Sequence, residues 1–101
     1  AVLKLPTKIR VGRRWYSVEV IEAMIDKSYV GRVHYDAQHI RIGTRDHSGK
    51  PFTKHEVGDT FWHELTHAIL HDMDSPLYRD ERFVSAFATR LNKAINTAKF
   101  E

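Results

Sequence analysis

The chain contains no cysteine, and this absence excludes two kinds of structure. Without thiols there is neither a disulfide framework nor a thiolate metal site. Any metal that the protein binds must therefore be held by histidines and carboxylates. A chain without cysteine also suits the cytoplasm, which is the location we expect.

Long apolar runs are missing as well. No stretch approaches the roughly 18 residues needed to span a membrane. No charged start followed by an apolar run and a small-residue cleavage site is visible, so we expect no signal peptide and no membrane partner. The 101 residues, 42% of them hydrophobic, fit one small domain over residues 1–101 with a core of its own.

Acidic residues are absent from the first eighteen positions, where several basic residues gather. The net charge is +3, and the first acid is Glu19. This pattern is typical of a solvated basic face, but it also fits a contact surface for an acidic partner or a nucleic acid. No helix-turn-helix, RNA-binding or zinc-finger signature supports the second interpretation. The basic residues are Lys4, Lys8, Arg10, Arg13 and Arg14.

The first part of the chain predicts strands. Residues 8–11 and 15–20 are rich in β-formers and could pair as a hairpin across Gly12. Apolar residues at helical spacing over residues 18–25 indicate a short helix instead, and both interpretations stay open. Residues 31–42 alternate apolar and polar side chains around a turn, which predicts an antiparallel hairpin with one exposed face. Residues 44–52 read as a loop.

Two helices follow. Thr53 and Glu56 have the spacing of a capping box, which predicts a helix start. Residues 72–76 should end this first helix, and a second amphipathic helix begins at about Asp80. A short antiparallel sheet packed on two antiparallel helices makes an α+β domain. The apolar stripe of the first helix is Val57, Phe61, Leu65, Ala68 and Ile69, and that of the second is Val84, Phe87, Ala88, Leu91, Ala94, Ile95 and Ala98.

The first helix carries a His-Glu-x-x-His motif at residues 63–67. Residues four apart on a helix point the same way, so His63 and His67 can offer imidazole nitrogens to one ion. Zn²⁺ binds such nitrogens and keeps positions for a third ligand and water. Glu64 lies beside the ion, where it can act as general base toward water. In a random chain of this length and composition the expected number of such motifs is about 0.03. This low number favours a metal site over two exposed histidines.

Several residues after the motif could supply a third ligand. His71 continues the four-residue spacing, but it lies about 12 Å along the helix from His63. A regular helix cannot bring both to one ion, and His71 suits the negative end of the helix dipole instead. Asp72 and Asp74 are closer to a turn that could fold back.

Glu81 is the third ligand that we expect. It opens the second helix, after a turn that sends the chain back, and zinc needs one more protein ligand beside two histidines. Acids are also favoured at helix starts for electrostatic reasons alone. Asp80 is the next candidate.

A hydrogen-bond donor would complete the site by stabilising negative charge in the transition state. Trp62 and Phe83, in contrast, are expected in the core. The donor candidates are Tyr78, His55, Tyr29 and Tyr35.

Residues 63–71, His-Glu-Leu-Thr-His-Ala-Ile-Leu-His, closely resemble the His-Glu-Leu-Gly-His-x-Leu-Leu-His segment of ImmA/IrrE-type zinc metallopeptidases. Residues 81–88 are similar to the downstream helix of that family, which brings a glutamate ligand. The resemblance covers about a third of the chain, residues 57–91. It implies a zincin-like fold, the ligand set His63, His67 and Glu81, and cleavage of regulatory proteins. Small zincin domains of this kind are common among phage and mobile-element proteins.

The sequence thus predicts a zinc-dependent metallopeptidase that cleaves a protein or peptide substrate, with Glu64 as general base. The edge of the hairpin at residues 31–42 would hold an extended peptide. The alternative is a non-proteolytic regulatory module, stabilised by zinc, whose basic N-terminal face binds protein or nucleic acid. Glu64 favours the enzyme, because a purely structural zinc site does not need it.

Overall fold

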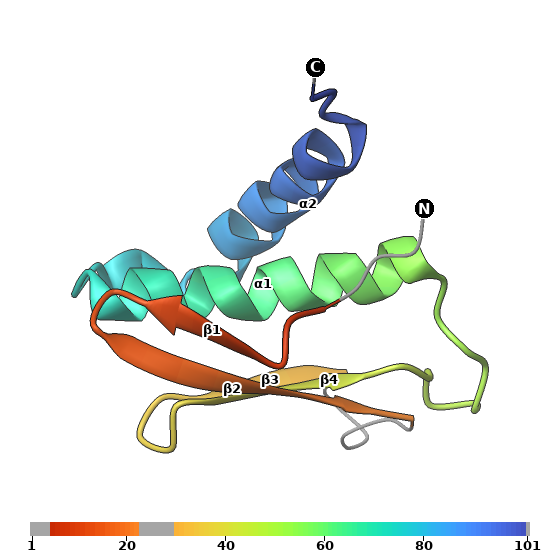
Figure 1. Cartoon of the computed structure of the whole chain (residues 1–101), viewed down its shortest axis with the longest axis horizontal. Helices are drawn as coiled ribbons and strands as arrows, with labels where there is room; N and C mark the ends of the chain where they lie inside the picture. The colour runs from red at the N-terminus through yellow and green to blue at the C-terminus, as the bar shows by residue number, and fades with distance from the viewer. Residues whose placement is uncertain (1–4, 23–29, 101) are drawn as a thin grey trace.

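A computed structural model describes residues 5–22 and 30–100. One sheet is followed in the chain by two helices (Figure 1), so the predicted α+β class is confirmed. Lys4 and the donor candidate Tyr29 lie outside the described residues. The elements are β1 (Lys8–Val11), β2 (Arg14–Ile21), β3 (Gly31–His34), β4 (His39–Gly43), α1 (Lys54–Asp72), the 3₁₀ turn η1 (Pro76–Arg79) and α2 (Glu81–Thr97).

The sheet is mixed, whereas the sequence predicted an antiparallel one. Its strand order is β1-β2-β4-β3. The outer pairings β1–β2 and β3–β4 are antiparallel, but β4 lies parallel to β2, with Val18 opposite Ile40. Burial explains the order, because Ile40 and Ile42 are fully buried and place β4 in the middle of the sheet. The pairing of β2 also shows that residues 18–21 form a strand and not a helix.

The core lies between one face of the sheet and α1. From the sheet come Val11, Tyr16 and the two isoleucines of β4, all buried. From α1 come Phe61, Leu65 and Ala68, three of the five residues in the predicted stripe. Removing these apolar side chains from water is the main force that holds α1 on the sheet.

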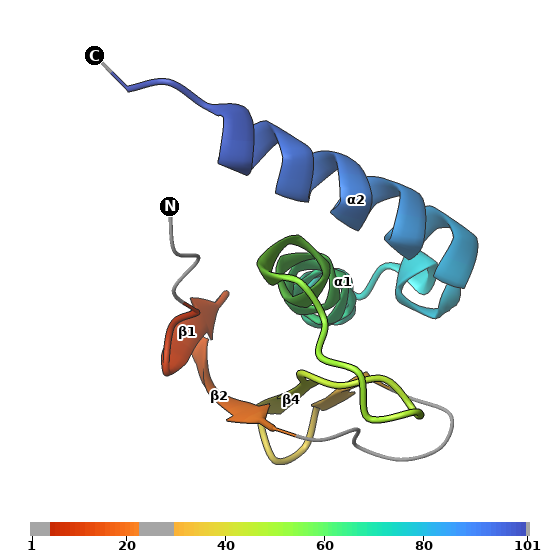
Figure 2. The ribbon, with the colours of Figure 1, turned by 90° about the vertical axis from the view of Figure 1, so that its right-hand side faces the viewer.

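The second helix packs against the side of α1 that faces away from the sheet (Figure 2). Only a narrow strip of α2 is fully buried there: Val84, Ala88 and Asn92. Phe87 and Ile95, which the sequence placed on the packed face, remain 48% and 46% exposed. The reason is geometric, since α2 has a single helix to cross and not a sheet to cover. Phe83 is also exposed, so its expected place in the core was wrong.

The capping box at the start of α1 is confirmed. Thr53 Oγ1 accepts a hydrogen bond from the Glu56 amide at 3.2 Å. Glu56 Oε1 in turn accepts one from the Thr53 amide at 2.9 Å. Within the described part of the chain, no helix is both long enough and apolar enough to cross a membrane.

Candidate metal centre

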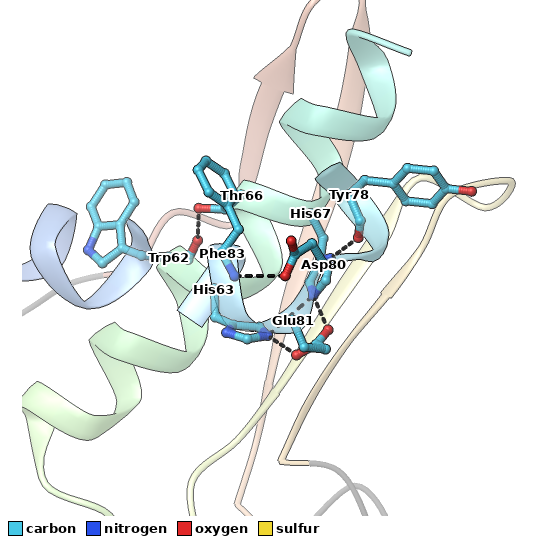
Figure 3. Close-up of polar contacts among 8 residues, drawn as sticks. All are labelled: Trp62, His63, Thr66, His67, Tyr78, Asp80, Glu81 and Phe83. Atoms are coloured by element: carbon cyan, nitrogen blue, oxygen red, sulfur yellow. Dashed lines mark hydrogen bonds and ion pairs between the residues drawn. The ribbon is translucent and has the colours of Figure 1, made fainter. Parts of the chain in front are cut away.

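The two histidines of the motif project from α1 beside the start of α2 (Figure 3). Their rings pack edge to face, with centroids 4.9 Å apart. The two Nε2 atoms lie 3.2 Å apart and point into the same space. The four-residue spacing therefore places both imidazole nitrogens toward one point, as the sequence predicted.

Glu81 comes to the same point from α2. Its Oε1 lies 2.7 Å from His67 Nε2, and its Oε2 lies 3.1 Å from His63 Nε2. The short η1 turn, capped by Ser75, reverses the chain within a few residues and brings the start of α2 back over the motif. Among residues 5–22 and 30–100, these three side chains form the one group of histidines and acids that can hold a metal ion.

The hydrogen bond behind His67 fixes which nitrogen faces the centre. Its Nδ1 lies 2.7 Å from the backbone oxygen of Tyr78. A carbonyl oxygen can only accept, so Nδ1 carries the proton and the Nε2 of a neutral ring presents a lone pair. Histidine ligands in metal sites are commonly oriented by such a bond on the second nitrogen.

The three converging atoms are all electron-pair donors. His67 Nε2 lies 2.7 Å from a carboxylate oxygen, and such a contact is favourable when either a proton on the nitrogen or a bound cation stands between the two atoms. Burial lowers the pKa of His63, and the nearby carboxylate of Glu81 opposes this shift. The neutral imidazole that burial favours is the form that binds metal. The donor set therefore fits a divalent ion held by two nitrogens and one carboxylate.

Glu64 is buried beside this group and is not part of it. Burial, and to a lesser degree the charge of Glu81, raise its pKa to about 7, while Arg32 acts in the opposite direction. Gly31 of β3 lies against it: a Cβ at this glycine would stand 3.1 Å from Glu64 Cγ and 2.6 Å from Thr60 Cγ2. The missing side chain lets the edge strand approach the carboxylate closely.

The other ligand candidates have different places. Asp80 is the N-cap of α2, and its Oδ1 accepts a bond from the Phe83 amide at 3.0 Å. His71 stacks on Tyr35 with ring centroids 4.0 Å apart. Asp72 ends α1, and Asp74 occupies a left-handed turn position with φ 55°. None of these four side chains belongs to the metal-binding group found within the described residues.

The donor candidates separate in a similar way. The Tyr78 hydroxyl is 2.9 Å from Arg79 Nε, and its ring points away from the three ligands (Figure 3). Tyr35 and Tyr78 both line the cavity that contains the ligands. Burial, helped by the charge of Glu64, raises the pKa of Tyr35 to about 12, so its hydroxyl keeps the proton that a donor needs. His55 is exposed near the start of α1.

Sequence reasoning missed the residues that act through their backbone or by their small size. The Tyr78 carbonyl orients His67, and Gly31 makes room for Glu64. A backbone acceptor leaves no mark in a sequence, and a glycine at the start of a strand is equally consistent with a turn. Neither role could be found without the fold.

Comparison with known proteins gives no further information about the site. No protein-family model, no curated protein and no solved structure matches this chain. What the site can do must therefore be argued from its own geometry.

Proposed function

We propose that the protein is a zinc-dependent hydrolase that cleaves peptide bonds. The observation that carries this proposal is the convergence of His63, His67 and Glu81 with a second carboxylate, that of the buried Glu64, beside this group. Two histidines and a glutamate are a ligand set of catalytic zinc sites, in which the fourth position is left for water or substrate. The resemblance of residues 63–71 to ImmA/IrrE-type peptidases agrees with it.

Zinc at this centre would supply a Lewis acid that polarises a carbonyl group and makes water more acidic. Glu64 accepts the proton of the attacking water and returns it to the leaving amine. Its burial favours this role, because a base with a raised pKa also serves well as the acid in the second step. Tyr35, which stays protonated, donates a hydrogen bond to the oxygen on which negative charge develops.

The position of the buried carboxylate beside an outer strand of the sheet indicates which class of substrate can reach it. Glu64 is 9% exposed, and β3, which borders it, is an outer strand of the sheet formed by the described residues. An extended peptide can add to such an edge by backbone hydrogen bonds. We therefore favour a protein or peptide as substrate over a small molecule. The expected location stays the cytoplasm, which a chain without cysteine suits.

The experiment combines metal analysis with a cleavage assay. Untagged protein should contain one zinc per chain, and a His63→Ala, His67→Ala double variant should contain none. Glu64→Gln should keep the zinc and lose at least about 100-fold in hydrolysis of a mixed peptide library. Glu56→Gln is the matched control, because it removes a carboxylate from the same helix and a glutamine preserves the capping box.

Two results would contradict the proposal. Zinc content unchanged in the double histidine variant would remove the metal site. Absence of any cleavage by zinc-loaded wild-type protein would leave a metal site without peptidase activity. Loss of zinc in Glu64→Gln would instead make Glu64 a ligand.

A second candidate function is supported by the outer face of the sheet, which α1 does not cover. Trp15 on β2 is 52% exposed there. Lys8 Nζ lies 5.0 Å and the Arg10 guanidinium 5.9 Å from the centre of its ring. An exposed aromatic ring between cations is suited to stack a base and neutralise the neighbouring phosphates. This arrangement supports a module that binds single-stranded nucleic acid.

Titration of a fluorescent single-stranded oligonucleotide at low and high salt tests this second function. A Lys8→Glu, Arg10→Glu variant should weaken binding at least tenfold and reduce its salt dependence, since two phosphate contacts are lost. Lack of binding by the wild type, or equal binding by the variant, would exclude it.

A further inference from the structure

Two cavities flank the catalytic carboxylate, one on each side. Both are lined by Gly31, His63 and Glu64. The first, here named the Asp59 cavity, has a volume of about 290 Å³. The second, the Tyr35 cavity, has about 270 Å³ and contains the remaining ligands, His67 and Glu81. A polypeptide that crosses Glu64 would therefore have room for a side chain on either side of the bond to be cleaved.

The side chains in the walls of the Asp59 cavity are small, and Asp59 is the one acid there besides Glu64. Apart from the shared residues they are formed mainly by Asp59 and Thr60 of α1 and by Ser85, Ala88 and Thr89 of α2. Three of these five residues are serine or threonine, which carry a small uncharged hydroxyl side chain, and one is alanine, so the walls take little space. The volume lies near the lower limit for small-molecule pockets, which is ample for one amino-acid side chain.

Asp59 is held in place by the most deeply buried polar residue of the helix pair. Asn92 of α2 has no exposed surface. Its Nδ2 donates to Asp59 Oδ1 at 3.0 Å and to the His55 carbonyl at 3.1 Å. Asn92 Oδ1 accepts from Asn96 Nδ2 at 2.8 Å, which fixes the orientation of the amide. Asp59 is consequently a positioned carboxylate and not a freely rotating surface acid.

One oxygen of this carboxylate is left for a ligand. The amide of Asn92 engages Oδ1, and within residues 5–22 and 30–100 no protein group engages Oδ2. A carboxylate that is fixed at one oxygen and accepting at the other is suited to pair with an ammonium or guanidinium group. An apolar side chain in the same cavity would offer Oδ2 no hydrogen-bond donor, and an acidic one would be repelled by the charge.

We propose that the Asp59 cavity is the specificity subsite of the enzyme, and that it accepts the side chain of a lysine or arginine next to the cleaved bond. This inference rests on the proposed peptidase function and adds its substrate class: polypeptides with a basic residue at a fixed position relative to the cleavage point. Asn92 is a positioning residue, since it acts on the substrate only through Asp59.

The test uses the zinc-loaded full chain on a library of mixed-sequence peptides, with products identified by mass spectrometry. Lysine and arginine should be enriched at one fixed position beside the cleaved bond. Two peptides that differ only there, lysine against norleucine, then give kcat/KM values. A hydrogen bond to a charged group predicts a preference for lysine of about 10- to 100-fold, and Asp59→Asn should abolish it.

Asparagine at position 59 still accepts the bond from Asn92, so the variant changes charge with little change in structure. Glu56→Gln removes a charge one turn earlier on α1, outside the cavity lining, and should keep the preference. Zinc content and Tm verify that both variants are folded. If Asp59→Asn does not bind zinc, the enrichment measured with the wild type decides.

The outcomes are distinct. Cleavage without enrichment of basic residues, or a lysine preference that survives in Asp59→Asn, overturns the subsite and leaves the peptidase standing. A preference lost equally in Glu56→Gln reduces the effect to general electrostatics and also overturns the subsite. If the zinc-loaded wild type cleaves nothing, the proposed function fails and the subsite fails with it.

Discussion

Replacing Glu81 with glutamine is the most direct test of the metal centre. The glutamate oxygens lie 2.7 Å and 3.1 Å from the two histidine Nε2 atoms. Glutamine keeps the length of the side chain but removes its charge and replaces one oxygen with an amide nitrogen. The Glu81 side chain is 69% exposed, so the metal-free fold should lose little stability. The effect should therefore appear in zinc binding and not in folding.

The size of the effect follows from linkage between binding and folding. Loss of a partner outside the ligand shell already costs about 10- to 100-fold in metal affinity, so loss of a ligand should cost at least about 100-fold. Zinc at 100 times its Kd stabilises the folded protein by about 2.7 kcal/mol. If Kd rises 100-fold, the same concentration gives about 0.4 kcal/mol. At about 4–8 °C per kcal/mol, the rise in Tm falls from about 11–22 °C to about 2–3 °C.

Thermal unfolding at buffered zinc concentrations measures this difference. Asp80→Asn is the matched control: asparagine caps a helix as well as aspartate does, so the cap bond to Phe83 should persist while a neighbouring charge is lost. It should retain the full zinc-induced rise in Tm. The reasoning would be refuted if Glu81→Gln kept that rise, or if Asp80→Asn lost as much of it.

Three further predictions concern the scaffold. Phe61→Ala, at a core position only 2% exposed, should cost about 3–5 kcal/mol in urea unfolding, while Phe87→Ala, about half exposed, should cost much less; equal losses would contradict the core assignment. Thr53→Ala should lower the free energy of unfolding by about 1 kcal/mol, and an unchanged Tm would show that the capping box contributes nothing. Because the pKa of Tyr35 is raised from 10.0 to about 12, its neutral form is favoured in the folded state. Stability should therefore fall as the pH rises through that interval, and the fall should be shallower in Tyr35→Phe; parallel pH curves for the two proteins would reject the assignment.

The sequence by itself determined the features that depend on residues close together in the chain. The capping box joins Thr53 to Glu56, and the spacing of His63 and His67 sets their common direction, because both follow from the geometry of a single helix. The apolar stripe of α1 likewise identified the face that packs on the sheet. The choice of Glu81 also came from the sequence, but through the expected reversal of the chain and the ligand requirement of zinc.

Only the tertiary structure decided how these pieces meet. The place of β4 between β2 and β3 follows from the competition of all strands for the covered position, which no local pattern expresses. Phe87 and Ile95 remain exposed because α1 covers only part of the apolar stripe of α2. The stripe itself does not indicate how much of it a neighbouring helix will cover. The bond from Asn92 to Asp59 joins residues 33 apart in the chain. Such contacts depend on how the two helices cross, and this is set by the packing of the whole domain and not by the periodicity of either helix.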